Sequence, residues 1–366
     1  MVDGKPDSSI SGAQHMTRPM RLAIAGVGLV GKRHADAITH LKEVALVAVV
    51  DPSTEGRDYA LENGLAHFNT LAEMFASETP DGVILSTPTP LHAEQGMECI
   101  SNNCAVLVEK PLAMSAEQAR PLVEAAETAG VPLLVGHHRR HNPLIRKAHD
   151  MISQGKIGAV RAVHANCWFY KPDHYFDVAP WRKLRGAGPI SVNLVHDVDL
   201  IRYLCGEIVS VQAQSAPSRR GFENEDVAAA VLGFENGAVG TITVSDSIVA
   251  PWSWEMTSGE YPVYPSTSQS CYQIGGSHGS LSVPDLTLWN HAEGRDWWTP
   301  ISATTTPRAA SDPLVLQIAH FVSVIQGNEQ PLVSGREGLK TLEVVEAIQI
   351  AAETKSLVSL GAKAVS

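Results

Sequence analysis

A glycine-rich segment near the N-terminus constrains the fold of this chain more than any other feature. Gly26-Val27-Gly28-Leu29-Val30-Gly31 follows the apolar run 21–25 and precedes a helix-compatible stretch that extends to residue 38. The first glycine permits a tight turn, the second lets the backbone approach a pyrophosphate, and the third lets the helix pack closely on the strand. This order predicts a strand, a turn and a helix whose N-terminus holds a dinucleotide.

The acidic residue that accompanies such a motif stands at the expected place. A second apolar run, 44–50, ends at Asp51, which follows Gly31 by about 20 positions, as the motif requires. A carboxylate there accepts hydrogen bonds from the ribose hydroxyls of the adenosine and would repel the additional phosphate of NADP. We therefore expect Asp51 to favour NAD over NADP.

Composition disfavours several classes of protein. The 366 residues are 44% hydrophobic and carry a formal net charge of −11, which fits a globular protein and disfavours nucleic acid or an anionic membrane as a partner. No apolar run is long enough to cross a bilayer, and the N-terminus lacks a secretory signal pattern. Five scattered cysteines without metal-like spacing are typical of reduced thiols. We expect a cytoplasmic protein that acts on a small molecule.

Apolar runs alternate with helical patterns in the first third of the chain. Residues 1–19 have no periodicity and predict a disordered leader or residues added by cloning. From 20 to 138 the alternation predicts an α/β domain with a doubly wound parallel sheet. Ser115 and Gln118 are spaced as a capping box, and Gly130 predicts the end of the helix that follows.

Strand-like segments that follow one another by turns predict an α+β domain with a mostly antiparallel sheet over residues 139–335. The expected strands are 160–169, 209–215, 227–234, 238–245 and 279–288, with Asn236-Gly237 as a hairpin turn. The expected helices are 142–153, 190–205, 313–326 and 337–355. Residues 252–270 are rich in Pro, Ser, Thr and aromatic residues, which predicts either an ordered loop or a plain connector.

Lys110 is the first candidate for chemistry. Glu109-Lys110-Pro111 follows the apolar run 105–108, at the expected carboxyl edge of the parallel sheet, where such sheets bind ligands. Removal of a hydride from a secondary alcohol requires a proton acceptor and positive charge near the developing alkoxide, and a lysine with a lowered pKa supplies both. The alternative is that Lys110 pairs only with Glu109 or with solvent.

His196 is the second candidate. Asn193, His196 and Asp197 are three and four positions apart, so one face of a helix can hold all three, and Asp199 can pair with His196 from an adjacent edge. Because histidine titrates near neutrality, His196 can pass the alcohol proton to water. The alternative is a histidine that is hydrogen-bonded within its own helix.

Together these segments resemble the Gfo/Idh/MocA oxidoreductases, named for glucose-fructose oxidoreductase and inositol dehydrogenase. The resemblance covers nearly the whole chain from residue 20. It rests on the glycine motif, on Thr87-Pro88-Thr89-Pro90-Leu91-His92, on Glu109-Lys110-Pro111, on residues 136–143 and 181–188, and on the helix of His196. It implies a Rossmann domain, a substrate and oligomerisation domain with a large open sheet, a C-terminal helix (336–366) that returns to the first domain, and homodimers or homotetramers built through the sheet.

The resemblance also implies roles for individual residues. Lys110 and His196 match the family's catalytic lysine and histidine, and Thr87 and Pro88 lie along the nicotinamide ribose. The remaining expected cofactor contacts in the matching segments are His92 and Glu109. Many members have an aspartate four residues before the histidine, where this chain has Val192. Either Asn193 orients the substrate or Asp197 orients the imidazole.

Further polar and aromatic side chains are candidates for the substrate wall. The expected substrate contacts are Arg139, Trp168, Trp181, Arg182, Asn193 and Asp197. Core packing is an equal alternative for both tryptophans. His137, His138 and His141 lie close in sequence, but the intervening arginines would oppose a cation, so we expect no metal.

The sequence thus favours an NAD-dependent oxidoreductase that transfers a hydride between a ring secondary alcohol and the nicotinamide. A sugar, inositol or similar cyclic polyol is the first substrate class. A cis-dihydrodiol of an aromatic acid is the second, with its carboxylate held by Arg182 or Arg139. Two alternatives remain open: a glycosidase that uses NAD transiently, and a non-catalytic NAD-binding regulator.

Overall fold

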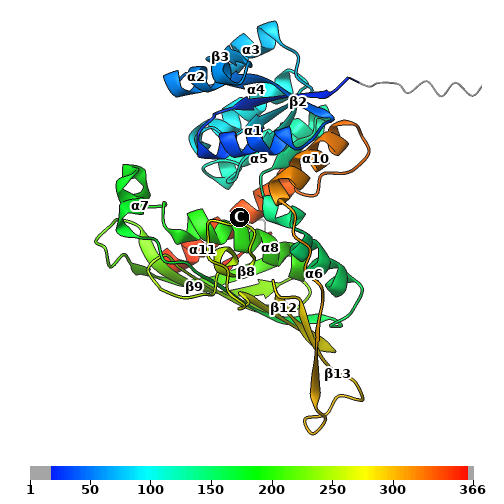
Figure 1. Ribbon diagram of the computed structural model, residues 1–366. Coiled ribbons are helices and arrows are strands. Elements are labelled where there is room, and N and C mark those ends of the chain that lie inside the picture. Colours follow the sequence, from blue (N-terminus) through cyan, green and yellow to red (C-terminus); the bar gives the residue numbers. More distant parts are fainter. Residues whose placement is uncertain (1–17, 362–366) are drawn as a thin grey trace, which may run out of the picture.

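The computed structural model describes residues 18–361, and within them the chain forms two domains, each built on one sheet (Figure 1). Most of the expected leader, residues 1–17, lies outside the described residues. In the described part of the chain, no helix combines the length and the apolar character that crossing a membrane requires.

The first domain is a doubly wound parallel sheet, as the sequence predicts. Its strands have the order β3-β2-β1-β4-β5-β6. They are β1 (Met20–Ala25), β2 (Val44–Val50), β3 (Ala66–Phe68), β4 (Gly82–Leu85), β5 (Ala105–Val108) and β6 (Leu133–Val135). The helices between them are α1 (Leu29–Thr39), α2 (Thr54–Glu62), α3 (Leu71–Ser77), α4 (His92–Ser101) and α5 (Ala116–Ala129). Strands β4, β5 and β6 are apolar and buried at every position, because helices cover both faces of the sheet.

Side chains cap α2, α3 and α5 of this domain, whereas α1 and α4 have no side-chain cap. Ser53, Thr70 and Ser115 accept the hydrogen bonds that cap α2, α3 and α5, and Gly130 ends α5 at a φ of +67°. The capping bond predicted for Ser115 is therefore confirmed. Helix α1 has no side-chain cap and no acidic residue in its first turn, so its N-terminal N–H groups remain free for a ligand.

The second domain is built on a nine-stranded sheet with the order β14-β13-β12-β11-β7-β10-β9-β8-β15. Only β7 and β10 run parallel, which confirms a mostly antiparallel sheet. The strands are β7 (Val160–Trp168), β8 (Ile208–Pro217), β9 (Glu225–Phe234), β10 (Val239–Ser245), β11 (Tyr272–Gly276), β12 (Gly279–Val283), β13 (Thr287–His291), β14 (Ile301–Thr305) and β15 (Val358–Ser359).

Three local predictions for this domain need correction. The single strand expected at 279–288 is two strands, β12 and β13, because Pro284 and Asp285 form a turn between them. Strands β11 and β14 were not predicted, because each alternates apolar and polar residues over only five positions. The helix expected at 190–205 begins with a wider π-type turn, Ile190–Leu194, before α8 (Val195–Cys205).

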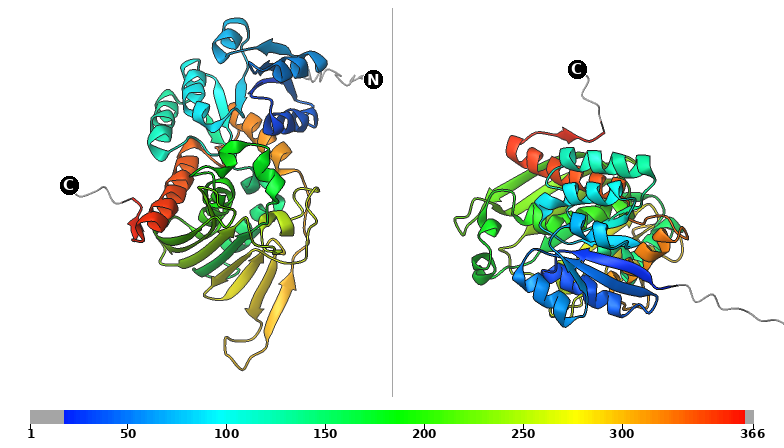
Figure 2. Two further views of the ribbon diagram at one scale, coloured as in Figure 1. Left: turned by 90° about the vertical axis from the view of Figure 1, so that its left-hand side faces the viewer. Right: turned by 90° about the horizontal axis from the view of Figure 1, so that it is seen from above.

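The helices of the second domain lie on one face of its sheet, and the other face is bare (Figure 2). They are α6 (Pro143–Ser153), α7 (Asp173–Asp177), α8, the short α9 (Trp254–Thr257) and α11 (Gly335–Thr354). Helix α10 (Pro313–Ile325) instead packs its Leu314, Ile318 and Phe321 with the apolar residues of the first domain. The chain thus returns to the first domain already at α10, and α11 then contributes to the cores of both domains.

Candidate active site

The glycine loop between β1 and α1 leaves space where a pyrophosphate would lie. A Cβ on Gly26 would approach the Ser86 and Thr87 backbone to 2.8 Å, and one on Gly31 would lie 1.9 Å from the Gly26 oxygen. A Cβ on Gly28 would meet nothing within 4 Å. The outer glycines therefore serve the fold, whereas Gly28 faces open space at the uncapped N-terminus of α1. This cradle fits a dinucleotide phosphate.

Asp51 lies at the end of β2, beside this loop. One carboxylate oxygen accepts the Val27 N–H at 2.9 Å, and the other accepts the N–H and hydroxyl of Ser53 at 2.9 and 2.6 Å. Burial alone would raise the pKa of Asp51, but the hydrogen bonds from Ser53 and Val27 lower it. The carboxylate is thus held ionised at the loop, and its contact with the ribose stays a prediction.

The segment after β4 positions the backbone near the expected nicotinamide ribose. Thr87 is half-buried there and Pro88 is exposed, and the Thr87 hydroxyl donates to Gln95 at 2.6 Å. His92 is buried, and its two ring nitrogens lie 2.8 and 2.9 Å from the carbonyl oxygens of Thr87 and Pro111. The expectation that His92 contacts the cofactor is wrong, because both nitrogens are used to join the two loops.

Glu109 has a similar internal role. It is buried at the end of β5, where His34 approaches one carboxylate oxygen at 2.8 Å and the Lys110 N–H donates to the other at 3.1 Å. Burial alone would raise the pKa of Glu109, but the hydrogen bond and the charge of His34 lower it to about 2. Glu109 thus fixes the backbone that carries Lys110, and its contact with the cofactor stays a prediction.

Lys110 extends from this edge toward the turn that precedes α8. Its Nζ lies 3.5 Å from the carbonyl oxygen of Val192. Burial lowers the pKa of Lys110 below its ordinary value of 10.5, the nearby Glu109 raises it, and the positive charges of Arg139 and Lys171 lower it further. The lower pKa makes the unprotonated amine, the form that accepts a proton, more accessible than in a solvated lysine.

His196 lies in the first turn of α8 and faces two other imidazoles. Its ring centroid is 6.3 Å from that of His137 and 5.8 Å from that of His138. The side chain is buried, and Nδ1 has no hydrogen-bond partner among the described residues. Burial lowers the pKa of His196 well below 6.5, and the charges of Lys110 and Arg139 add to this. A neutral imidazole with a free nitrogen therefore lies close to Lys110.

The π-type turn separates two side chains that the sequence placed on one face. Asn193 accepts a hydrogen bond of 2.6 Å from the Nζ of Lys171, whereas Asp197 is fully buried and receives a short hydrogen bond from the Tyr272 hydroxyl. The expectation that Asp197 contacts substrate is therefore wrong. Burial raises the pKa of Asp197 to about 6.

Asp199 does not pair with His196 either. Its carboxylate accepts hydrogen bonds of 2.8 to 3.1 Å from Arg140, which also contacts Glu337 on α11 at 3.1 Å. A buried guanidinium with two planar donor pairs competes better for a carboxylate than a neutral imidazole does. This network fixes α8 against α11 and so holds His196 in place.

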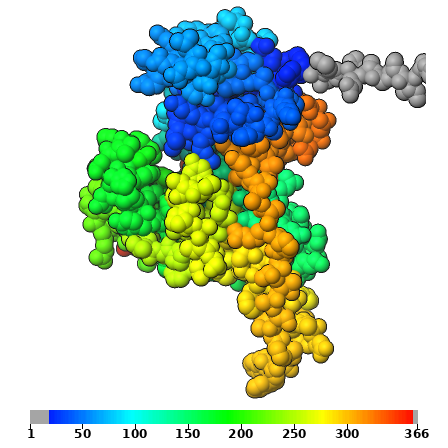
Figure 3. Space-filling model, in the orientation of Figure 1, coloured from blue at the N-terminus to red at the C-terminus, as the bar shows by residue number. Residues whose placement is uncertain are grey.

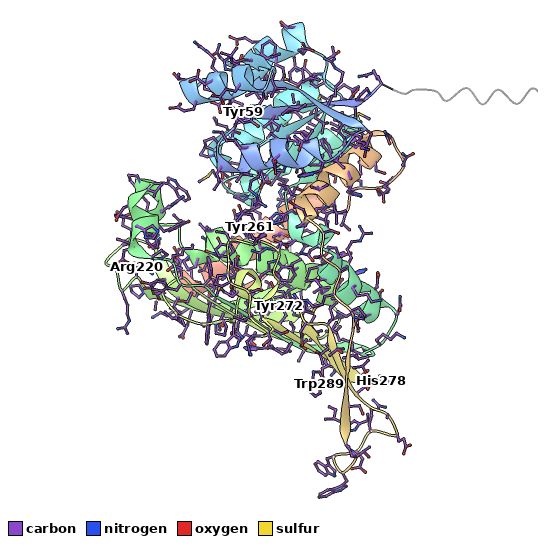
Figure 4. All side chains as sticks on the ribbon, in the orientation of Figure 1. Tyr59, Arg220, Tyr261, Tyr272, His278 and Trp289 are labelled. Carbon is purple, nitrogen blue, oxygen red and sulfur yellow. The ribbon has the colours of Figure 1, made fainter. Side chains whose placement is uncertain are left out.

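A loop over residues 252–270, which we call the strap, forms one wall of the site. Its Glu255 accepts a hydrogen bond of 2.6 Å from Arg139, and its Glu260 accepts one of 2.7 Å from Asn142 and lies 3.3 Å from His138. Tyr261 lies between the domains (Figure 4), with the Arg33 guanidinium of α1 4.4 Å from its ring centroid. The strap is thus an ordered loop that reaches the cofactor domain.

Three further residues expected to contact substrate are Trp168, Trp181 and Arg182. Trp168 alternates with the buried Cys167 on β7, so it faces the bare side of the sheet and packs on Trp252; its expected substrate contact is wrong. Arg182 donates to the carbonyl oxygen of Tyr175 at 2.7 Å and stacks on the Tyr175 ring, while Trp181 is half exposed. Both belong to the segment of α7, which rises beside the recess between the domains (Figure 3).

Comparison with known proteins decides the family. The sequence model of an oxidoreductase family with an NAD-binding Rossmann fold matches residues 20–137, and that of the GFO/IDH/MocA C-terminal domain matches residues 145–282. The 1,5-anhydro-D-fructose reductase of Ensifer adhaerens is 31% identical over 326 residues, which are 84% of this chain and 89% of that protein. The chain belongs to the Gfo/Idh/MocA family of oxidoreductases. Its first domain is therefore an NAD-binding domain.

Other Gfo/Idh/MocA relatives extend this result over nearly the whole chain. The scyllo-inositol 2-dehydrogenase (NAD(+)) of Bacillus subtilis is 26% identical over 90% of this chain and 93% of its own length. The WlbA dehydrogenase of Bordetella pertussis, solved in complex with NADH and UDP-GlcNAcA, has a TM-score of 0.78 and 27% identity, covering 94% of this chain and 100% of that one.

Sequence reasoning missed two parts of the site. Lys171 follows β7, and its position directly after a predicted strand was the available signal. Glu255 and Glu260 belong to the strap, which has no periodic pattern to predict where its side chains point. In residues 18–361 no group of three or more metal-binding side chains is arranged to hold a metal ion, including at His137, His138 and His141.

Proposed function

We propose that this protein is an NAD-dependent dehydrogenase of a ring secondary alcohol, with Lys110 and His196 as its proton-transfer pair. The observation that carries the proposal is the burial of a lysine and a neutral histidine together, at the carboxyl edge of the sheet that holds the glycine loop. NAD, when bound, supplies the acceptor for a hydride from the alcohol carbon.

The residues of the chain would handle the proton. Unprotonated Lys110 accepts the hydroxyl proton, and the resulting ammonium group stabilises the negative charge that develops on the oxygen. His196 hydrogen-bonds to the same hydroxyl and relays the proton toward water. Glu109 holds the Lys110 backbone at one end of this arrangement, and the Arg140 network holds α8 at the other.

Preference for NAD over NADP is part of this proposal. The support is the ionised carboxylate of Asp51, whose pKa is lowered by hydrogen bonds from Ser53 and Val27. An anion at the end of β2 repels a second anion and favours a ribose diol.

Sugars and inositols come first among substrates, because relatives over most of the chain are a sugar reductase and an inositol dehydrogenase. Carboxylated compounds come second. A 4-carboxy-2-hydroxymuconate-6-semialdehyde dehydrogenase of Sphingobium is 30% identical over 62% of this chain and 72% of its own length.

The test is a screen for NADH formation with sugars, inositols, uronic acids and aromatic dihydrodiols. We expect one class to reduce NAD, and Lys110→Met to lower kcat by about 10²- to 10⁴-fold, the usual contribution of a general base, while NAD binding is retained. Cleavage of a glycoside without net NADH would instead indicate a glycosidase. Turnover that survives Lys110→Met would overturn the role of the lysine.

We also propose that copies of the chain associate through the bare face of the nine-stranded sheet. Three rows of paired residues cross this face, and none contains Lys, Arg, Asp or Glu. The rows are Gln212, Val231, Thr241, His164 and Gln273; Gln214, Ala229, Thr243 and Asn166; and Gly233, Val239, Ala162, Gly275, Ser280 and Trp289. Two chains that each carry a net charge of −11 repel one another least where they expose no charge.

A further inference from the structure

Lys171 is a second lysine near the site, and it does not belong to the proposed catalytic pair; its Nζ also lies 5.0 Å from the centroid of the Tyr175 ring. It follows β7, and only 7% of its side chain is exposed. Its ammonium group donates to Asn193 at 2.6 Å and lies 3.8 Å from Asp246, which is beyond hydrogen-bond distance. Within residues 18–361 two of its three N–H donors therefore have no hydrogen-bond partner.

The carboxylates near Lys171 and Lys110 are already paired with other groups. Asp246 accepts a hydrogen bond of 2.9 Å from Arg220, and Glu255 accepts one of 2.6 Å from Arg139. Glu109 pairs with His34 at 2.8 Å. Among the described residues Lys110 has no carboxylate within ion-pair distance, and Lys171 has a long ion pair of 3.8 Å with Asp246, a carboxylate that it shares with Arg220. A second carboxylate, from a ligand, would give the buried ammonium group a closer partner.

The arginines that the sequence favoured for holding a carboxylate are less suitable. Arg139 is neutralised by Glu255, and its Nε and Nη1 are buried without contact to the recess. Arg182 stacks on Tyr175 and donates to that residue's backbone. Lys171, by contrast, is held in place by Asn193, which belongs to the same turn as Val192, the contact of Lys110.

We propose that Lys171 binds a carboxylate of the substrate, so that the protein oxidises a hydroxyl of a carboxylated ring compound rather than of a neutral sugar. This inference rests on the proposed function and makes its substrate class specific. The two lysines then have separate tasks: Lys110 accepts the hydroxyl proton, and Lys171 positions the ring as an ammonium group through a charge-assisted hydrogen bond. Burial lowers the pKa of Lys171, and the nearby carboxylate of Asp246 opposes that shift and favours the ammonium form.

Calorimetric titration of the NAD-loaded protein tests this independently of turnover. The probes are pairs that differ in the carboxylate: D-glucuronate and D-glucose, D-galacturonate and D-galactose, and a cis-dihydrodiol with and without its carboxyl group. We expect at least one acid to bind the wild-type protein more tightly than its neutral counterpart. Lys171→Gln keeps a hydrogen-bond donor for Asn193 and removes the charge. It should therefore lower the affinity for that acid by about 10- to 100-fold and leave the affinity for the neutral compound unchanged.

Two further variants separate recognition from a structural role. Lys171→Arg keeps the charge and should retain the preference for the acid. Lys183→Gln, at a surface lysine paired with Asp177, should change the affinity for neither the acid nor its neutral counterpart. The proposal is contradicted if the acids bind the wild-type protein no better than their neutral counterparts. It is also contradicted if the preference for the acid survives in Lys171→Gln while the melting temperature of that variant is unchanged. Acid binding through Lys171 without NADH formation would instead reject the proposed function alone.

Discussion

At the scale of single residues, the site depends on how burial acts on Lys110 and His196. Burial lowers the pKa of both groups, since each loses its hydration when charged, and neighbouring cations lower it further. For both residues the shift favours the unprotonated form relative to a solvated side chain. The surroundings of this pair differ from the arrangement expected in many relatives, in which an aspartate occupies the position of Val192.

The pH dependence of turnover should report Lys110. Because the base must be unprotonated, kcat/KM should rise with pH and level off above the pKa of Lys110, with a midpoint below the ordinary lysine value of 10.5. His196 is already neutral at pH 6.5, since its pKa lies well below that value. It should therefore cause no additional change in kcat/KM near neutral pH. Steady-state rates across pH for wild type and Lys110→Met measure this; a rising limb that persists in the variant would contradict the assignment.

The sequence predicted the place of a side chain in the fold where that side chain is tied to a local motif, and the chemical roles of these residues stay predictions. Lys110 follows a strand in a short triplet, and His196 lies in a helix of readable period. Lys171, Glu255 and Tyr272 meet this site from segments 60 or more residues from Lys110, and their partners are fixed only by tertiary packing. Asp197 and Asp199 were misplaced because helical spacing does not say which residue on a neighbouring element takes the carboxylate.

At the scale of elements, we expect the cofactor pyrophosphate to accept hydrogen bonds from the free N–H groups at the uncapped N-terminus of α1. Gly28→Ala tests it, because the backbone there has a φ of −66° and the added Cβ meets no protein atom within 4 Å. The melting temperature without NAD should stay unchanged. NAD should bind about tenfold or more weakly, as expected when a methyl group occupies close-packed space.

The matched variant at the third glycine should behave in the opposite way. A Cβ at Gly31 would lie 1.9 Å from the Gly26 oxygen, so Gly31→Ala should destabilise the fold itself. Thermal melting and NAD titration of both variants distinguish the two roles. Unchanged NAD affinity in Gly28→Ala would mean that the pyrophosphate does not lie at this turn.

Elements were predictable in proportion to the regularity of their pattern. The parallel strands are continuous apolar runs, and Ser115 and Gly130 delimit α5 as expected. The division into β12 and β13 was missed because apolar residues continue through the turn at Pro284. The π-type turn before α8 was missed because one extra residue per turn leaves no signature in a short segment.

At the scale of the whole molecule, the uncharged sheet face should mediate self-association. Val231 is 47% exposed in the single chain and lies in the middle row of that face. Val231→Asp should leave the monomer folded and shift light-scattering mass toward the monomer, because symmetry brings two new charges together. Leu61→Asp, at an exposed leucine of α2, is the control and should leave the mass unchanged. An unaltered mass in Val231→Asp would place the interface elsewhere.

The two-domain plan was predictable because each half has its own periodicity, alternating strands and helices first and successive strands afterwards. The way the halves join was less accessible. Helix α10 reaches the first domain through Phe321 and Ile325, which pack where Gly82 leaves room on β4. Such a contact between residues more than 200 positions apart depends on complementary shape and has no local pattern.

Transfer of deuterium tests the central claim most directly. With a substrate found in the screen and labelled with deuterium at the carbinol carbon, NADH formed by the wild-type protein should carry the label, and Lys110→Met should form it at least about 100-fold more slowly. NADH without the label, or labelled NADH formed equally fast by the variant, would contradict a hydride transfer that depends on Lys110.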